Sequence, residues 1–324
     1  MDHFLELLIC PACAGALTAD WLCIGCGARY EARDGIPNLR LPSNARVDKV
    51  RRFYEYAPFP GYSENDSLSS LRARAERNEF ARRLDQAIPG NARILEIGCG
   101  TGQMSLHLAR ADRLVIGADL TRASLELAAA AAHRFKLDGV LFVETDLHRP
   151  GLRAASFDVV YSSGVLHHTP NPRAAFARIV QLVRPGGVIV LGLYNAIARI
   201  PHRLRRVIAR WSNYRVIPFD PVLNSRKNET ARRVAWLRDQ YLHPEEHRHT
   251  LGEVQRWFVE NDVEFVRAYP SALIGEDAED LFAFAGDNWR LEGWLAQLGW
   301  IHALGHEGGL FVTIGQRKWR RCVR

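Results

Sequence analysis

Long apolar runs are missing from this sequence. No stretch of about 18 consecutive apolar residues occurs, so the chain offers no candidate for a membrane-spanning helix. The first ten residues, MDHFLELLIC, carry acidic side chains where a secretory signal peptide needs basic ones. Repeats and low-complexity tracts are also absent. We therefore expect a globular cytoplasmic protein, and 324 residues suffice for one large α/β domain with additions.

Cysteine is scarce and unevenly distributed. Of the six cysteines, four form the pairs C-P-A-C and C-I-G-C, which are separated by nine residues. Two C-x-x-C pairs at this spacing are typical of zinc ribbons, in which four thiolates surround one Zn²⁺ ion and leave no position for a catalytic water. A disulfide pairing is the alternative, but a reducing compartment disfavours it. The predicted ligands of this structural zinc site are Cys10, Cys13, Cys23 and Cys26.

Breaks in the pattern divide the chain into three parts. Gly35, Pro37 and Pro42 end a zinc-ribbon module over residues 1–42. An aromatic, proline-rich stretch and a helical pattern then form a linker and lid segment over 43–90. Residues 91–324 alternate between short apolar strands and helices, with helical insertions at about 195–249 and 271–307. This alternation predicts an α/β fold with a mostly parallel sheet covered on both faces.

Seven strands are expected in the third part. Five lie at 93–97, 113–118, 140–144, 157–162 and 188–193, and the segments EFVRAYP and GGLFVTIG supply two more. Helices are expected to begin near Gln103, Ser124 and Arg173, and VRPGG at 183–187 is expected to be a turn. Thr250 and Glu253 fit a capping box at the start of a later helix.

The segment ILEIGCGTGQ places an acid and three glycines after the first of these strands. Its spacing, E-x-G-x-G-x-G, differs from the G-x-G-x-x-G of dinucleotide sites. Glycines remove Cβ atoms where a ligand lies against the backbone. Glu96 suits a ligand with an amino group and a sulfonium better than a pyrophosphate. Asp119 ends the second strand, where it can accept hydrogen bonds from a ribose, and Asp146 ends the third, where it can hold an adenine amino group.

Five ordered motifs resemble those of class I S-adenosylmethionine-dependent methyltransferases, in particular a methyltransferase type 11 domain. They are ILEIGCGTGQ, GADLTRASLELA, ETDL, FDVVYSSGVLHHTPNP and LVRPGGVIVLGLYN, and they span about residues 91–195. The resemblance implies a Rossmann-like seven-stranded sheet with helices on both faces and S-adenosyl-L-methionine as cofactor. The cofactor-binding residues that it implies are Glu96, Gly98, Gly100, Gly102, Gln103, Asp119, Leu120, Asp146, Leu147 and Ser162.

The N-terminal part carries a second resemblance. LLICPACAGAL and CIGCGARYEARDGIPNL are similar to the zinc-ribbon module that is fused to, or partnered with, several methyltransferases. One relative with a comparable order is the bacterial 23S ribosomal RNA guanine methyltransferase, whose zinc module is associated with RNA binding. This likeness keeps RNA open as the methyl acceptor.

The loop after the fourth strand faces the methyl group in this fold, and here it contains VLHH. An N-P-P-Y type of motif, which clamps exocyclic amines, is absent, and VLHH resembles the corresponding loop of small-molecule O- and C-methyltransferases. His167 or His168 can accept a proton at neutral pH, since the ordinary pKa of histidine is near 6.5. The alternative is that one of them packs or caps the following turn.

Three tyrosines, Tyr54, Tyr56 and Tyr62, lie on the segment before the core, which often folds over the cofactor in this family. At least one of them is expected in a lid, and packing between modules is the alternative. The candidate catalytic residues are therefore His167, His168 and Tyr54.

Two later segments leave more than one interpretation open. HPEEHRH is either a metal site, part of the acceptor pocket or a polar lead-in to the helix at Thr250. A metal site would use His243, His247 and His249 near Glu245 and Glu246, whereas the acceptor pocket would use His243, His249 or the preceding Asp239. AIARIPHRLRRVIARW has an apolar stripe of Ile197, Ile200, Leu204, Val207, Ile208 and Trp211, opposite Arg199, Arg203, Arg206 and Arg210. It is either a surface helix over the substrate site or a contact for anionic lipid, a phosphorylated substrate or RNA.

Three functions compete on these observations. They are methyl transfer to a small-molecule or lipid-like acceptor, methyl transfer to RNA, and a zinc-bearing binding or activator protein without transfer activity. Glu96, the glycines and Asp119 favour an enzyme, and VLHH favours the small-molecule or lipid-like acceptor. The net charge of +7 leaves room for an anionic partner and for peripheral membrane contact without a span. No motif indicates the oligomeric state.

Overall fold

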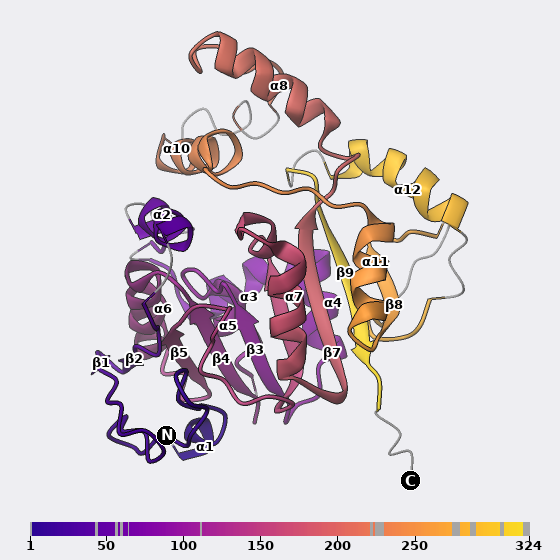
Figure 1. Cartoon of the computed structure of the whole chain (residues 1–324). Coiled ribbons are helices and arrows are strands. Elements are labelled where there is room, and N and C mark those ends of the chain that lie inside the picture. Colours follow the sequence, from indigo (N-terminus) through magenta and orange to yellow (C-terminus); the bar gives the residue numbers. More distant parts are fainter. Residues whose placement is uncertain are drawn as a thin grey trace.

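The computed structural model describes residues 2–42, 45–55, 58, 61–63, 65–110, 112–220, 223, 230–273, 279–285, 290–304 and 308–319. Its centre is a seven-stranded sheet with the order β5-β4-β3-β6-β7-β9-β8 (Figure 1). β9 runs antiparallel to both neighbours, and the other pairs are parallel. The strands are β3 (Arg93–Ile97), β4 (Leu114–Asp119), β5 (Val140–Glu144), β6 (Phe157–Ser163), β7 (Val183–Tyr194), β8 (Val263–Tyr269) and β9 (Leu310–Arg317). The predicted Rossmann-like α/β sheet is confirmed.

One predicted boundary is wrong. The expected turn at 183–187 is the beginning of β7, because Val183 already pairs with Phe157 of β6. The register shifts directly after this pair, and Gly186 takes a positive φ of 76°. A Cβ on Gly187 would lie 2.9 Å from the carbonyl oxygen of Asp158. The two glycines therefore permit a close approach of two strands at an irregularity, where the sequence pattern indicates a turn.

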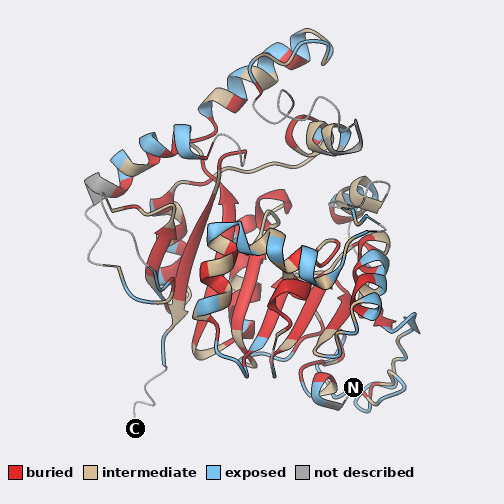
Figure 2. Cartoon of the chain, turned by 180° about the vertical axis from the view of Figure 1, so that it is seen from behind, coloured by how far each residue is buried: buried red, intermediate tan, exposed pale blue. Residues whose placement is uncertain are grey.

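Helices cover both faces of the sheet (Figure 1). One face carries α3 (Leu68–Glu76), α4 (Glu79–Ala87), α5 (Gln103–Leu108) and α6 (Arg122–Arg134), and the other carries α7 (Pro172–Ile179), α11 (Leu251–Glu260) and α12 (Arg290–Ala303). Of the predicted capping box, the structure shows the Thr250 half, since the Thr250 side chain accepts a hydrogen bond from the Glu253 amide at 3.3 Å, while the Glu253 carboxylate lies 3.0 Å from His249 Nδ1. Figure 2 shows that the strands between these layers are almost entirely buried.

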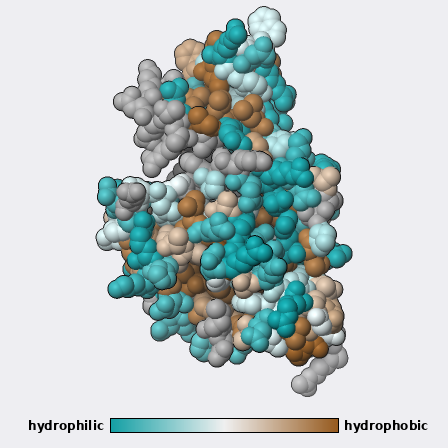
Figure 3. Space-filling view, turned by 90° about the vertical axis from the view of Figure 1, so that its left-hand side faces the viewer, coloured by the Kyte–Doolittle hydropathy of each residue, from teal (hydrophilic) through white to brown (hydrophobic). Residues whose placement is uncertain are grey.

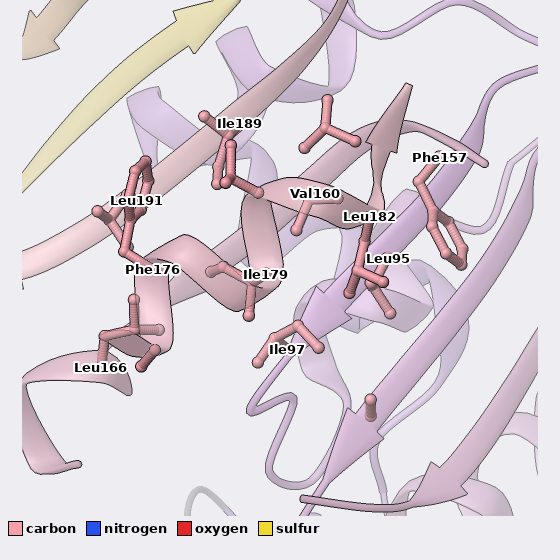
Figure 4. Packing of buried hydrophobic residues seen from close by; sticks show 14 of the residues in the cluster. Leu95, Ile97, Phe157, Val160, Leu166, Phe176, Ile179, Leu182, Ile189 and Leu191 are labelled. Atoms are coloured by element: carbon pink, nitrogen blue, oxygen red, sulfur yellow. The ribbon is translucent and has the colours of Figure 1, made fainter. Parts of the chain in front are cut away.

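α7 forms the centre of the second face. Its core contacts are apolar throughout, and Phe176 stacks on Phe258 of α11 with ring centroids 5.3 Å apart. Figure 4 shows the side chains that fill this layer, namely Leu95, Ile97, Phe157, Val160, Leu166, Phe176, Ile179, Leu182, Ile189 and Leu191. This packing fixes the carboxyl ends of β3 and β6, from which the candidate site is built.

The N-terminal module packs on β5, on the face of the sheet that carries α7. In most parallel sheets a helix of the crossover connection covers this position. Residues 145–156 connect β5 with β6, and all of them are described and none is helical. Instead, Phe4, Leu7 and Leu8 join the core that contains Leu141 and Val143 of β5. The module comprises α1 (Asp2–Leu5) and a small hairpin of β1 (Ala32–Arg33) and β2 (Ile36–Pro37).

Backbone hydrogen bonds join residues 144–153, at the end of β5 and after it, to two parts of this module, residues 7–9 and residue 39. The Ile9 amide donates to the Gly151 carbonyl at 2.9 Å, and the Arg153 amide donates to the Leu7 carbonyl at 2.8 Å. Next to them, the amide of Leu39 donates to the carbonyl of Glu144 at 2.9 Å. The N-terminal module is thus joined to the sheet through the loop that carries Asp146.

The chain between β7 and α11 forms an excursion whose ends meet. The Ala196 amide donates to the His249 carbonyl at 3.0 Å, and the His249 amide donates to the Tyr194 carbonyl at 2.9 Å. The excursion contains α8 (Ile200–Trp211), α10 (Thr230–Leu237) and η3 (Arg238–Leu242), a π-helical turn. α8 projects from the body of the molecule (Figure 1). In the part of the chain that the structure describes, no helix has the length and apolar character to cross a membrane.

Candidate active site

A cavity of about 480 Å³ opens at the carboxyl ends of β3, β4, β5 and β6. This edge is where open α/β sheets bind their ligands. The helix α2 (Ala45–Glu55) lies across the cavity and lines it with Val47, Val50 and Tyr54. From the other side η3 contributes Arg238 and Asp239. The cavity is therefore enclosed between strand ends and two segments that are distant in the sequence.

The glycine loop leaves β3 along the wall of the cavity. Gly98 and Gly100 both line it and have positive φ angles of 72° and 52°. A Cβ on Gly98 would approach Val165 to 2.2 Å, so this position needs glycine for packing as well as for a ligand. The carboxylate of Glu96 accepts a hydrogen bond from the Ser105 hydroxyl at 2.5 Å. Burial raises the pKa of Glu96 to about 7.

Asp119 is fixed at the end of β4 by three hydrogen bonds. Its Oδ2 accepts from the Gly100 amide at 2.8 Å, and its Oδ1 accepts from the Thr121 amide at 2.8 Å and the Thr121 hydroxyl at 2.6 Å. Each carboxylate oxygen has two lone pairs, so Oδ2 retains acceptor capacity toward the cavity that Asp119 lines. The side chain is preorganised to accept from a hydroxyl group.

Asp146 and Leu147 line the cavity where the chain leaves β5. The Asp146 Oδ1 accepts hydrogen bonds from the amide of His148 at 2.9 Å and from its ring Nδ1 at 2.8 Å. Burial acts to raise the pKa of Asp146, but the hydrogen bonds from His148 outweigh it and lower the pKa. The predicted residues Gln103 and Leu120 also line this end of the cavity.

Two of the predicted cofactor residues lie in the packing around the cavity and do not line it. A Cβ on Gly102 would lie 2.7 Å from the Phe142 ring and 2.8 Å from Ala128, so the third glycine lets α5 approach its neighbours. Ser162 is fully buried and donates its hydroxyl to the carbonyl of Ile97 at 3.0 Å. Sequence spacing cannot separate such positions from ligand contacts, because both need a small residue.

Of the two adjacent histidines, the structure brings only His168 to the cavity. His167 is fully buried and stacks on the Tyr194 ring at a centroid distance of 3.8 Å. Among the described residues neither of its ring nitrogens has a hydrogen-bond partner, and burial lowers its pKa well below the ordinary value. His167 therefore packs against Tyr194, which corrects its assignment as a base. His168 is the histidine of this pair that could act as one.

The far end of the cavity brings together Tyr54, His168 and Asp239. The hydroxyl of Tyr54 donates to the Asp239 Oδ1 at 2.9 Å, and burial raises the pKa of Tyr54 well above its ordinary value. The Nε2 of His168 lies 3.9 Å from the same carboxylate oxygen. On the other carboxylate oxygen, Asp239 accepts from the Gln240 amide group at 2.8 Å and from the Tyr194 hydroxyl at 3.2 Å.

Hydrogen bonding assigns the tautomer of His168. Its Nδ1 lies 2.7 Å from the carbonyl oxygen of Glu245, which can only accept, so Nδ1 carries the proton. The Nε2 atom then holds a free lone pair on the side of Asp239. Burial lowers the pKa of His168, although the Asp239 charge acts in the opposite direction. The ring is therefore neutral at pH 7 and able to accept a proton.

Several side chains of this end have no local signal in the sequence. Arg238 lies over the Phe53 ring at 5.1 Å and donates to the Phe53 carbonyl at 3.2 Å, and both line the cavity. His243 stacks behind His168 with ring centroids 3.7 Å apart, and burial lowers its pKa to about 3. The π-helical turn η3 sets the direction of Asp239, and such turns recur at functional sites.

The other two lid candidates have different outcomes. The hydroxyl of Tyr62 donates to the carbonyl of Thr101 at 2.6 Å, which places it beside the glycine loop. Tyr56 lies outside the described residues. Tyr54 is thus the tyrosine of this segment that the structure shows in the cavity wall.

The four N-terminal cysteines converge on one point. Their sulfur atoms all lie within 4.8 Å of one another, with 3.7 Å between Cys10 and Cys26 and 3.4 Å between Cys13 and Cys23. A tetrahedral zinc site with Zn–S bonds of about 2.3 Å separates its sulfurs by about 3.8 Å. A Cβ on Gly15 would lie 3.0 Å from the Cys23 sulfur, so the knuckle needs glycine there. The donor set and its spacing fit a zinc ion.

The histidines of HPEEHRH are engaged with nearby acids. His249 Nδ1 lies 3.0 Å from Glu253, and His247 Nε2 lies 3.3 Å from Glu245. Among the described residues, the cysteine cluster is the one group of three or more histidine, cysteine or acidic side chains arranged to hold a metal. The metal interpretation of this segment therefore gains no support, and His243 lies in ring contact with His168 behind the cavity wall.

The core of the chain matches a known family. Residues 95–191 fit a family profile described as a methyltransferase domain. This core is a methyltransferase domain. The match covers β3 to β7, from which Glu96, Asp119, Asp146 and His168 reach the cavity. The resemblance of the sequence motifs to S-adenosylmethionine-dependent methyltransferases is confirmed, and the cysteine cluster is consistent with a zinc ribbon.

Curated relatives are similar to the methyltransferase domain rather than to the whole chain. The sterol 24-C-methyltransferase of Debaryomyces hansenii is 30% identical over 153 residues, which are 45% of this chain and 39% of that protein. The 27-O-demethylrifamycin SV methyltransferase of Amycolatopsis mediterranei is 32% identical over 136 residues, 41% of this chain and 49% of that protein. The matches thus span about half the length of these relatives or less.

A solved structure shares the fold over most of the chain. The crystal structure of the 4+2 cyclase SpnF superposes with a TM-score of 0.50 and 18% identity, covering 88% of this chain and 99% of that one. Because that protein is described as a cyclase, the shared fold does not by itself define a reaction. The chemistry has to be argued from the side chains of the cavity.

Proposed function

We propose that this protein transfers a methyl group from S-adenosylmethionine to a small-molecule or lipid-like acceptor. The observation that carries the proposal is the composition of one cavity. One end holds Glu96, Asp119 and Asp146, and the other holds Tyr54, His168 and Asp239. A site for a bound cofactor thus faces a site that can orient and deprotonate a second molecule.

The residues of the first end suit each part of the cofactor. When bound, S-adenosylmethionine supplies an electrophilic methyl group on a sulfonium sulfur. Asp119 would accept hydrogen bonds from the ribose through its Oδ2, and Asp146 would hold the adenine amino group beside Leu147. Glu96, ionised by the approach of a cationic ligand, would hold the amino group. The glycine loop lets this ligand lie against the backbone, since Gly98 and Gly100 lack side chains.

The residues of the second end would prepare the acceptor. Methyl transfer is an in-line displacement, so positioning of the acceptor atom contributes most of the catalysis. His168 is neutral with a free lone pair on Nε2, and a hydroxyl acceptor would pass its proton to that atom. Asp239 lies 3.9 Å from Nε2 and would stabilise the imidazolium that results. Tyr54 holds Asp239 in place by its hydrogen bond of 2.9 Å.

The lining of the cavity favours an apolar acceptor. Most of the lining is apolar, and it includes Val47, Val50, Phe53, Met104 and Val165. α2 and η3 contribute to this lining from outside the sheet and partly cover the cavity. The two curated relatives described above are named for small-molecule acceptors, a sterol and a rifamycin.

The proposal is tested with methyl-labelled S-adenosylmethionine and an extract of cells that lack this protein. After reaction, the RNA, protein and solvent-extractable fractions are counted separately. We expect label in the solvent-extractable fraction, and its loss with an Asp239→Asn variant that still binds the cofactor. Label confined to RNA would overturn the proposal and assign the zinc-ribbon module to RNA binding. Label confined to protein would overturn it equally.

A further inference from the structure

α8 presents its apolar side to solvent. With 3.6 residues per turn, Ile200, Leu204, Val207, Ile208 and Trp211 fall within an arc of about 100° on the helix surface. The buried residues of the helix, His202 and Ala209, lie on the opposite side. A surface helix of a globular protein normally buries its apolar stripe against the core. In α8 the apolar stripe instead faces solvent. The stripe therefore does not cover the substrate site, as a surface helix over that site would.

The exposure of this stripe is large. Leu204 is 64% exposed, Val207 67% and Trp211 93%, and Phe219 beyond the helix is 87% exposed. Figure 2 shows α8 as mainly exposed, and Figure 3 shows apolar surface gathered at the end of the molecule where α8 lies. Contiguous apolar surface of this kind marks an interaction site.

Positive charge flanks the stripe. Residues 200–219 contain five arginines and no acidic residue. On one side of the stripe, Arg203, Arg206 and Arg210 join Arg248 around a hollow of about 500 Å³. Glu246 pairs with Arg206 at 2.8 Å, whereas among the described residues no carboxylate lies within ion-pair distance of Arg203 or Arg210. The hollow therefore has uncompensated positive charge beside exposed apolar side chains.

We propose that α8 and residues 212–219 dock on the surface of a lipid bilayer that contains anionic lipids. Trp211, Leu204, Val207 and Phe219 enter the boundary between headgroups and acyl chains, and the arginine-lined hollow receives lipid phosphates. Helices that lie in this boundary combine an apolar stripe with flanking basic residues. RNA would account for the arginines but would leave the aliphatic Leu204 and Val207 exposed to water.

This surface adjoins the acceptor end of the cavity. His243 lines the arginine hollow and stacks on His168, which lines the cavity, at a centroid distance of 3.7 Å. Docking would hold the cavity close to the membrane surface, where an apolar acceptor concentrates. This consequence rests on the proposed function, whereas the docking itself does not require that the protein transfer methyl groups.

The test is sedimentation of the full chain with vesicles, without cofactor or acceptor. We expect binding to vesicles of phosphatidylcholine and phosphatidylglycerol and little binding to phosphatidylcholine alone. The variant Leu204→Ser/Val207→Ser/Trp211→Ser should bind roughly tenfold less or weaker still. The affinity of Arg203→Ala/Arg210→Ala for these vesicles should be about 25-fold lower at low salt. Each arginine near an anionic surface contributes about fivefold to the affinity. All substituted side chains are exposed, so the fold is retained.

Two controls match these variants. Val259→Ser replaces a 77% exposed valine on α11, and Arg178→Ala replaces an exposed arginine on α7. Both should bind vesicles as the unsubstituted protein does. The proposal is overturned if the protein stays in the supernatant with anionic vesicles, or if the triple serine variant binds them undiminished. Retention by RNA that depends on the arginines but not on the apolar residues would also overturn it, as would a dimer that only the apolar substitutions dissociate.

Discussion

The cofactor end of the cavity comes from neighbouring strand ends, whereas the acceptor end comes from side chains as far apart in sequence as Tyr54 and Asp239. Glu96, Asp119 and Asp146 each follow from a strand and the turn after it. Tyr54, His168 and Asp239 meet only because α2 and η3 close over the sheet. The first end is determined locally, and the second depends on how distant segments pack.

This difference predicts that the two ends fail separately. A change at the cofactor end should alter the affinity for S-adenosylmethionine, and a change at the acceptor end should alter turnover with that affinity unchanged. Variants that separate binding from turnover therefore test the division directly.

The largest effect is expected from the zinc ligands. Cys10→Ser/Cys23→Ser removes a site whose metal contributes about 10–16 kcal/mol in comparable peptides. The loss uncovers the face of β5 on which Phe4, Leu7 and Leu8 pack and frees the loop that carries Asp146. We expect the melting temperature to fall by about 10 °C or more and the cofactor affinity to fall with it. Thermal unfolding, calorimetry and metal analysis check this.

A chelated sample of the unsubstituted protein serves as the control, since added zinc should restore it and should not restore the double variant. Full thermal stability of the double variant would show that the module is not part of the structural core. Normal stability with reduced turnover alone would instead assign the module to acceptor binding.

Asp119→Ala should weaken cofactor binding by about 10- to 100-fold. The variant removes the charged Oδ2 that would accept a ribose hydrogen bond, and a hydrogen bond to a charged group contributes about 1.5–3 kcal/mol. It also frees the Gly100 amide that Oδ2 holds at 2.8 Å. Calorimetric titration with S-adenosylmethionine measures the change. The exposed Asp138, replaced by alanine, is the matched control, and an unaltered affinity in Asp119→Ala would contradict the ribose assignment.

Asp239→Asn should lower kcat by about 100-fold while the cofactor affinity stays the same, because the base His168 would lose the carboxylate that stabilises its imidazolium, and general-base catalysis contributes a factor of about 100 or more. The Asp239 charge raises the pKa of His168, although burial keeps that pKa below its ordinary value. The base acts only when neutral, so the rate falls as the pH drops through its pKa. Removal of the charge lowers that pKa further, and the acid limb of the pH–rate profile should move to lower pH.

A pH–rate profile of His168→Gln separates this role from simple packing. The variant should lose the acid limb, whereas His167→Gln should keep it even if its stability is lower. An acid limb that stays in place in both Asp239→Asn and His168→Gln would show that His168 is not the base.

The smallest effect is expected from Glu96→Gln. Burial raises the pKa of Glu96 to about 7, so this carboxyl is half protonated at neutral pH in the free protein. The ionised form attracts a cationic ligand, and it prevails above the pKa. Affinity for S-adenosylmethionine should therefore rise by about tenfold between about pH 6 and about pH 8, and the glutamine variant should lose this dependence. Titrations at the two pH values decide the point.

The sequence places most of the residues that line the cofactor end of the cavity close together, for a physical reason. A strand, a glycine turn and a helix occupy consecutive residues, so the order of Glu96, Gly98, Gly100 and Asp119 already implies their proximity. Gly102 and Ser162 follow the same motif but serve packing, since a Cβ on the first would meet Phe142. Small residues are needed for both purposes, and spacing alone does not separate them.

The acceptor end was only partly predictable. His167 and His168 are adjacent in the sequence, and the 3-10 turn Leu166–His168 decides which ring reaches the cavity. The position of Asp239 in the cavity wall depends on a π-helical turn, and no pattern in the sequence predicts that turn. The orientation of α8 was likewise hidden, because its periodicity defines an apolar stripe without saying which way the stripe faces.

The N-terminal module is synthesised long before the residues on which it docks. Its cysteines leave the ribosome before the strands of the large sheet do, and they can assemble a zinc site among themselves. The partners of residues 7–9 and 39, however, are residues 151–153 and Glu144, which emerge more than 100 residues later. The apolar surface of Phe4, Leu7 and Leu8 thus stays uncovered until β5 and the loop after it are made, when the chain has completed β3, β4 and β5 of the seven-stranded sheet. Metal supplied early in translation would keep the module folded during that interval and protect the nascent chain from aggregation.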